Sequence, residues 1–149
     1  MHLEYTLENE HSVAFHAFTH SDMQTLIGTA EGYLGANNEL VTVIKVSEEF
    51  ISKGYGYRLF TEVFQYITDR DVIHSVIGSW SKHAEFSYCE NGQSTNLSVF
   101  QQLKEKGFTD AEAAFCTPTG KWAKRIGFDN VTFHMIKDHE IKVEFTKIR

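Results

Sequence analysis

Residues 41–70 read VTVIKVSEEFISKGYGYRLFTEVFQYITDR, and this stretch decides the fold. Its first part, residues 41–46, is β-branched and apolar with polar interruptions, which predicts a strand. Residues 56–70 instead carry apolar side chains at helical spacing, and these are Leu59, Phe60, Val63, Phe64 and Ile67. That pattern predicts an amphipathic helix. A strand therefore runs through a turn that contains Gly54 and Gly56 directly into a helix.

The segments before and after this stretch extend it to one α/β domain over residues 1–149. The first 46 residues alternate as half-buried strands do, and the turn at 35–38 predicts a hairpin. Residues 72–80 form a short apolar, β-branched run, which predicts a buried strand. Strand, helix and strand in this order imply a parallel crossover, because two parallel strands need a long connection.

The second half of the chain predicts helices followed by a closing hairpin. Helical patterns cover residues 96–106 and 119–126, and Thr109 begins a capping box that starts a short helix between them. Two alternating segments joined around Asp138 then predict a terminal hairpin. The polar residues 81–95 predict a long loop, and long loops in compact domains are often functional.

The glycine turn has the features of a phosphate-binding site. At a helix N-terminus several backbone N–H groups point outward, and the helix dipole adds partial positive charge. Glycine lets an anion approach the backbone closely. Lys53 and Arg58 add positive charge beside this turn. A dinucleotide-binding turn would need a third glycine where this chain has Leu59.

Residues 49–56, EFISKGYG, follow an alternating strand and precede a helix, and in this they resemble the GNAT superfamily of N-acetyltransferases. The signature of that family is Arg/Gln-x-x-Gly-x-Gly/Ala in the same position, and this chain departs from it at Ile51. The resemblance implies acetyl-coenzyme A as co-substrate. It places coenzyme A binding on Ile44, Val46, Ile51, Ser52, Lys53, Gly54, Tyr55, Gly56 and Arg58.

The resemblance also implies a central sheet that is mixed, mostly antiparallel and splayed at one parallel strand pair. Two segments compete for the second family motif, a helix that ends in Gly-Phe. One ends at Phe108 and the other at Phe128, and both lack the tyrosine that often serves as general acid. We favour the second segment, which makes residues 82–116 an insertion that reaches over the active site. The GNAT-like helices after the first strand are reduced here.

Transfer of an acyl group from a thioester needs a base, an oxyanion donor and an acid for the departing thiolate. The resemblance places the thioester where the two central strands diverge, so the backbone N–H of Val46 becomes the expected oxyanion donor. The candidates for proton transfer are Glu31 on the neighbouring strand and Tyr88 in the long loop. Asn96 is the candidate positioning group.

These features predict an acyltransferase that moves an acetyl group from acetyl-coenzyme A to an amine or hydroxyl of a small molecule or protein. The reduced N-terminal region and the insertion also suit a toxin or effector domain. Two alternatives stay open. One is a small metal-independent ribonuclease-type toxin that uses histidine and tyrosine as acid and base. The other is a non-catalytic binding module of the same fold.

Composition and charge limit the classes of partner that we expect this chain to bind. The net charge of −6 and a pI near 5.7 argue against a partner bound mainly through phosphates of nucleic acid. The eight histidines show no metal-ligand spacing. We expect no membrane partner, since no apolar run is long enough to cross a bilayer. The start of the chain has no signal-peptide pattern. The expected location is the cytoplasm, or outside the cell as part of a longer effector chain.

Overall fold

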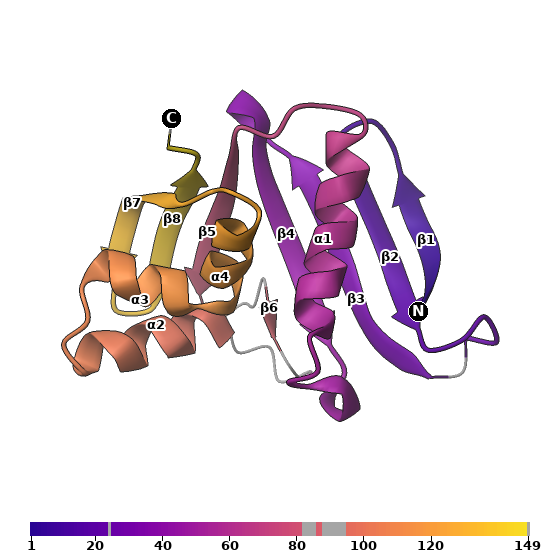
Figure 1. Cartoon of the computed structure of the whole chain (residues 1–149), viewed down its shortest axis with the longest axis horizontal. Helices are drawn as coiled ribbons and strands as arrows, with labels where there is room; N and C mark the ends of the chain where they lie inside the picture. Colours follow the sequence, from indigo (N-terminus) through magenta and orange to yellow (C-terminus); the bar gives the residue numbers. More distant parts are fainter. Residues whose placement is uncertain (24, 82–85, 88–94, 149) are drawn as a thin grey trace.

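The computed structural model describes residues 1–23, 25–81, 86–87 and 95–148. They form one twisted sheet with a layer of helices against one face (Figure 1). The strand order is β1-β2-β3-β4-β5-β8-β7, and a short strand β6 pairs with β4 off this path. The strands are β1 (His2–Glu8), β2 (Ser12–Phe18), β3 (Leu26–Leu34), β4 (Glu39–Val46), β5 (Ser75–Ser81), β6 (Phe86–Ser87), β7 (Asn130–Lys137) and β8 (Glu140–Thr146).

The predicted fold class is confirmed. Within the described residues the sheet is mixed and mostly antiparallel, and β4 pairs in parallel with β5 and with β6. No α-helix interrupts the described residues from β1 to β4, as expected from the strand-like first half. The α-helices are α1 (Tyr55–Thr68), α2 (Thr95–Glu105), α3 (Asp110–Cys116) and α4 (Pro118–Arg125), and the short 3-10 turns are η1 (Ala36–Asn38) and η2 (Glu48–Phe50).

One boundary was wrong. The sequence predicts a strand from residue 72, whereas β5 begins at Ser75. The side chain of Val72 is 60% exposed. Its backbone lies outside the sheet, because its N–H donates to Asp71 Oδ1 at 2.8 Å and its carbonyl accepts from Asn38 Nδ2 at 2.7 Å. Hydrogen bonds to the side chains of Asn38 and Asp71 therefore keep the backbone of Val72 out of the strand that the apolar pattern predicts.

Helix α1 covers the first half of the sheet. Its apolar stripe, Leu59, Phe60, Val63 and Ile67, is fully buried. The strand beneath it carries Gly28 and Gly32 where a side chain would collide. A Cβ on Gly32 would lie 2.3 Å from Val63 Cγ1, and one on Gly28 would lie 2.2 Å from the carbonyl oxygen of Lys45. These glycines let the helix and the adjoining strand approach β3 closely.

The remaining helices cover the second half and join the same core. Trp80 of β5 packs against Phe145 of β8 and Phe100 of α2, with ring centroids 6.3 and 6.1 Å apart. Helix α4 bridges the two halves, because Trp122 packs on Phe60 of α1 at 5.5 Å. The predicted insertion 82–116 therefore contains α2 and α3, which contribute buried side chains to the common core.

Local capping explains where these helices begin. The predicted capping box is confirmed: Thr109 Oγ1 accepts from Glu112 N–H, and Glu112 Oε1 accepts from Thr109 N–H. Thr117 ends α3 and begins α4, since its hydroxyl donates to the Ala114 carbonyl and accepts from Gly120 N–H. Pro118 then occupies the first position of α4, where no N–H is needed.

The packing against β3 gives a test of the fold. We expect Gly28→Ala to lower the free energy of unfolding by about 1–3 kcal/mol, because the added methyl group forces β3 and β4 apart. Gly35→Ala is the matched control, since its nearest neighbour would lie at 3.6 Å, an ordinary contact. Urea unfolding followed by circular dichroism measures both. Equal stability of the two variants would contradict the close approach of β3 and β4.

Candidate functional site

The centre of the candidate site is the place where two parallel strands part. β4 and β5 pair at only three positions, which are Glu39–Ser75, Leu40–Val76 and Val41–Ile77. Beyond Val41, β4 stays paired with β3 and β5 stays paired with β8. The inner edges of β4 and β5 therefore separate, and the backbone groups on the inner edge of β4 need other partners.

The inner edge of β4 carries the amide predicted to be the oxyanion donor. Ser47 N–H donates to the Ile27 carbonyl at 2.7 Å, so Ser47 and Lys45 direct their polar backbone groups toward β3. By the alternation of a strand, Ile44 and Val46 direct theirs toward the gap. The Val46 amide, which the family resemblance makes the expected oxyanion donor, is therefore directed away from β3.

The gap beside Val46 is occupied. β6 pairs in parallel with β4 at Ile44–Phe86 and Lys45–Ser87. With this register, the N–H of Val46 is directed at the backbone of Ser87. The predicted oxyanion donor therefore faces another segment of the same chain. The sequence predicts only a long loop here, because a strand of two residues has no periodicity to detect.

The predicted phosphate-binding residues lie in the turn after β4. Ser52 and Gly54 have positive φ angles of 60° and 84°, and Gly54 caps α1 without any side-chain hydrogen bond. Residues 51–54 form a turn, and among the described residues no well-aligned hydrogen bond is donated by the amides of residues 52–57, whereas Arg58 N–H donates to the Gly54 carbonyl at 3.2 Å. These open amides lie at a helix N-terminus, where the dipole favours an anion.

Three cations surround this first turn of α1. Lys53 Nζ lies 5.8 Å from the ring centre of Phe50, and Arg58 Cζ lies 5.3 Å from that of Tyr55. Arg125 reaches over from α4, and its Cζ lies 3.8 Å from the ring centre of Tyr57. All three cationic side chains belong to exposed residues. Lys53 and Arg58 were predicted; Arg125 was missed, because only the packing of α4 on α1 brings it here.

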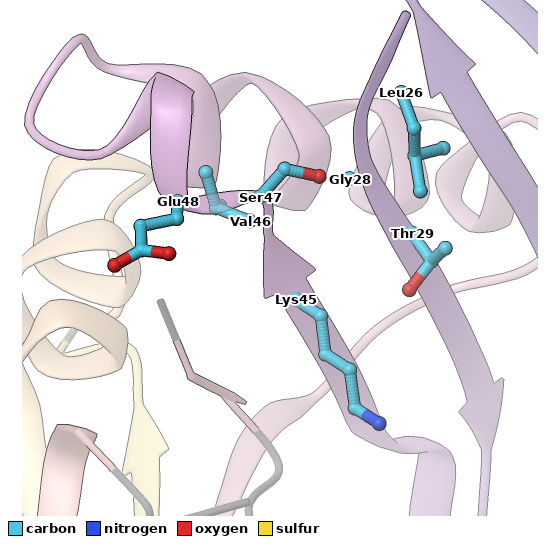
Figure 2. A pocket seen from close by; sticks show the side chains of 7 residues that line it. All are labelled: Leu26, Gly28, Thr29, Lys45, Val46, Ser47 and Glu48. Carbon is cyan, nitrogen blue, oxygen red and sulfur yellow. The ribbon is translucent and has the colours of Figure 1, made fainter. Parts of the chain in front are cut away.

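A cavity of about 670 Å³ lies at the carboxyl end of β4 (Figure 2). It is lined by Leu26, Gly28, Thr29, Lys45, Val46, Ser47 and Glu48. Figure 2 shows that these residues come from the facing ends of β3 and β4 and from the start of η2. Of the predicted residues that the structure describes, only Val46 lines the cavity. Thr29, Lys45 and Glu48 supply polar groups that the sequence analysis did not identify.

Of the predicted catalytic residues, the two that the structure describes, Glu31 and Asn96, do not share a site. Glu31 is exposed on the face of β3 away from α1, opposite Val43, and it does not line the cavity. Asn96 is fully buried; its Oδ1 accepts from Thr119 N–H at 2.9 Å and its Nδ2 donates to Thr119 Oγ1 at 2.8 Å. These two bonds fix the start of α4. Tyr88 lies outside the described residues.

The ends of the two competing helices also differ. Phe128 is completely buried and packs on Phe64 of α1 at 6.1 Å, whereas Phe108 is 38% exposed. Gly107 and Gly127 both have positive φ, so both helices end as predicted. Phe128 therefore belongs to the hydrophobic core, and Phe108 does not.

A second hollow of about 460 Å³ lies beside β7 and β8, and His134 lines it. His134 Nε2 lies 2.9 Å from Glu144 Oε1. This hydrogen bond lowers the pKa of the Glu144 carboxyl, and partial burial opposes the shift. Another histidine, His11, pairs with Asp71 at 3.2 Å. Among the described residues no three His, Cys, Asp or Glu side chains gather as metal ligands would.

Comparisons with known proteins find no match, so the assignment of a function rests on the residues described above. No protein-family model matches the chain, and no curated protein or solved structure matches it either. Among the described residues, no helix is both long enough and apolar enough to cross a membrane.

The ion pair on β7 and β8 gives a pH prediction. We expect His134→Ala to raise the pKa of Glu144 toward its ordinary value of 4.5, because the hydrogen bond is lost. A lowered carboxyl pKa stabilises the fold above the unfolded pKa, and this contribution is lost as pH falls through the folded value. The stability difference between wild type and variant should therefore fade in acid. Carboxyl chemical shifts in an NMR titration measure the pKa.

An internal reference makes this titration specific. The pKa of Glu112 is lowered by the capping hydrogen bonds with Thr109, far from the exchange at position 134 in the sequence. It should stay lowered in His134→Ala. An unchanged Glu144 titration in the variant would show that His134 does not hold this carboxylate.

Proposed function

We propose that this chain is a GNAT-like acyltransferase that transfers an acetyl group from acetyl-coenzyme A to an amine or hydroxyl. The observation that carries the proposal is the set of open amides at residues 52–57, at the start of α1. They directly follow the strand that parts from its parallel neighbour. A diphosphate bound at the turn then has a strand edge and a cavity beside it for the rest of the ligand.

The proposal gives each part of the site a role. The amides of Ser52–Tyr57 hold the diphosphate, and Lys53, Arg58 and Arg125 supply the charge that balances it. The inner edge of β4 pairs with the amide groups of the coenzyme arm. The N–H of Val46 then stabilises the oxyanion that forms when the thioester carbonyl is attacked. Ile51 contributes backbone only, since it lacks a hydrogen-bonding side chain.

The acceptor chemistry takes place at the cavity. The acceptor nitrogen or oxygen attacks the thioester carbonyl, the carbon–sulfur bond breaks, and coenzyme A leaves as the thiolate, which takes up a proton. The acceptor loses one proton, so a base is required. Glu48 is the carboxylate that lines the cavity and replaces Glu31 as our first candidate. Lys45 and Thr29 are placed to contact the acceptor.

The face of the sheet that no described helix covers indicates which class of acceptor the chain could use. The described helices all lie against one face, and residues such as His16, Glu31 and Lys45 on the other face are exposed (Figure 1). Family members carry acceptor-binding helices after the first strand, and this chain does not. We therefore extend the proposal to a macromolecular acceptor, as a toxin or effector domain would have.

One specific observation favours the alternative of a non-catalytic module. A non-catalytic binding module of the same fold would have its site filled, and β6 lies in the gap beside β4. The ribonuclease alternative requires histidines in one cleft. In the described ion pairs, His11 instead pairs with Asp71, and His134 pairs with Glu144.

Ligand binding at the turn is tested by thermal unfolding. We expect acetyl-coenzyme A to raise the melting temperature of the wild type in a concentration-dependent way, because it binds only the folded state. Gly54→Asp should abolish the shift, since a carboxylate then faces the diphosphate. Gly54→Asn is the matched control: it has the same shape, tolerates the positive φ and carries no charge.

Two outcomes contradict the proposal. The first is the absence of any shift for wild type and Gly54→Asn at millimolar ligand. The second is an equal shift in Gly54→Asp, which moves the anion site away from this turn.

The base is tested by activity. Glu48→Gln should lower kcat by about a hundredfold or more, because the acceptor proton then has no carboxylate to receive it, and should leave the KM for acetyl-coenzyme A near the wild-type value. Release of the coenzyme A thiol is measured against a panel of amines and lysine-containing peptides. Glu31→Gln is the rival variant. A large loss there, with Glu48→Gln unaffected, would return the role to Glu31.

A further inference from the structure

The strand edge that would bind the coenzyme arm is already in use. Beyond Val41 the inner edge of β4 has no partner in β5, and β6 pairs with it at Ile44 and Lys45. β6 is two residues long, and it comes from the connection between β5 and α2. A segment of the chain itself therefore stands where an extended ligand would lie along β4.

The register shows which atoms are involved. Lys45 and Ser47 use their polar groups toward β3, so the groups directed at β6 belong to Ile44 and Val46. In a parallel ladder each such residue bonds to the two residues that flank its partner. The pairing of Lys45 with Ser87 thus directs Ser87 N–H at the Ile44 carbonyl, and Val46 N–H at the Ser87 carbonyl.

We infer that β6 is an autoinhibitory strand, which must leave β4 before an acyl-coenzyme A arm can pair with Ile44 and Val46. The inference rests on the proposed function, since it concerns the same site. Each N–H carries one proton, so the Val46 amide does not serve the Ser87 carbonyl and an oxyanion together. Binding at the strand edge and the β6 pairing are mutually exclusive.

The β6 strand blocks only one part of the proposed coenzyme-binding site. The amides of residues 52–57 remain open while β6 is in place, so the diphosphate has a site in the closed form. Only the strand edge is blocked. For binding that includes the strand edge, the apparent dissociation constant is then the intrinsic one divided by the fraction of molecules in which β6 has left. A change that weakens the pairing of β6 with β4 raises that fraction. It therefore increases the affinity for acetyl-coenzyme A without changing the turn at residues 52–57.

Proline tests this mechanism. Ser87→Pro removes the N–H directed at the Ile44 carbonyl, and the ring prevents close pairing there. Ser87→Ala is the matched control, because it changes the side chain and keeps the backbone N–H. Two measurements are made on all three proteins: hydrogen exchange of the Val46 amide by NMR without ligand, and the affinity for acetyl-coenzyme A by isothermal titration calorimetry.

The expected result has two parts. Exchange of the Val46 amide should be at least about tenfold faster in Ser87→Pro than in wild type and Ser87→Ala, since the strand pairing that protects it is lost. The Lys45 amide, which faces β3, is the internal reference and should not change. The affinity for acetyl-coenzyme A should rise at least about tenfold in Ser87→Pro alone.

The failures are distinguishable. A Val46 amide that exchanges equally fast in all three proteins would overturn the blocking contact. Faster exchange in Ser87→Pro with an unchanged affinity would overturn autoinhibition and leave the acyltransferase proposal standing. If none of the three proteins binds acetyl-coenzyme A although Val46 is released, the proposed function fails together with the inference, and β6 is an ordinary part of the sheet.

Discussion

The structure depends on the parting of β4 and β5 after three residue pairs. Each strand is held on its outer side: β4 pairs with β3, and β5 pairs with β8 along its whole length from Ser75 to Ser81. With both outer edges fixed, the twist of the sheet separates the inner edges. Buried backbone groups do not stay unpaired, so the separation requires an occupant.

The same constraint fixes the position of the proposed phosphate-binding turn. β4 ends at Val46, and η2 and Gly54 reverse the chain so that α1 returns across β2, β3 and β4. The start of α1 is therefore fixed at the end of the strand whose inner edge is exposed. Gly28 supports this arrangement, because its missing side chain lets β3 lie close to the Lys45 backbone at the mouth of the cavity. Packing and anion site thus arise from one connection.

Most of the fold was predictable because its signals are local. The helical stripe of α1, the capping box at Thr109 and the glycines that end α2 and α4 each depend on residues close in the sequence. Val72 was misassigned, because hydrogen bonds from Asn38 and Asp71 outweighed its β-branched context. Strand propensity yields to such tertiary contacts.

The site was less predictable than the fold. The turn at residues 51–56 follows from glycine and helix chemistry, which sequence displays directly. Arg125 reaches the site through the packing of α4 on α1, and Thr29 through the register of β3 on β4, and neither is visible in a single sequence. Glu48 lines the cavity from the start of η2, a short turn without a periodic pattern. Asn96 illustrates the converse: a polar residue at a motif position serves to cap α4.

The separation of cradle and strand edge has a consequence for the order of binding. Under the proposed function, the amides at the start of α1 bind the diphosphate whether or not β6 is paired, and long-range charge from Lys53, Arg58 and Arg125 favours early contact there. A ligand anchored by its diphosphate then competes with β6 from a tethered position, at high effective concentration. A strand of two residues contributes few hydrogen bonds, so this competition is balanced closely enough for small changes in β6 to decide it.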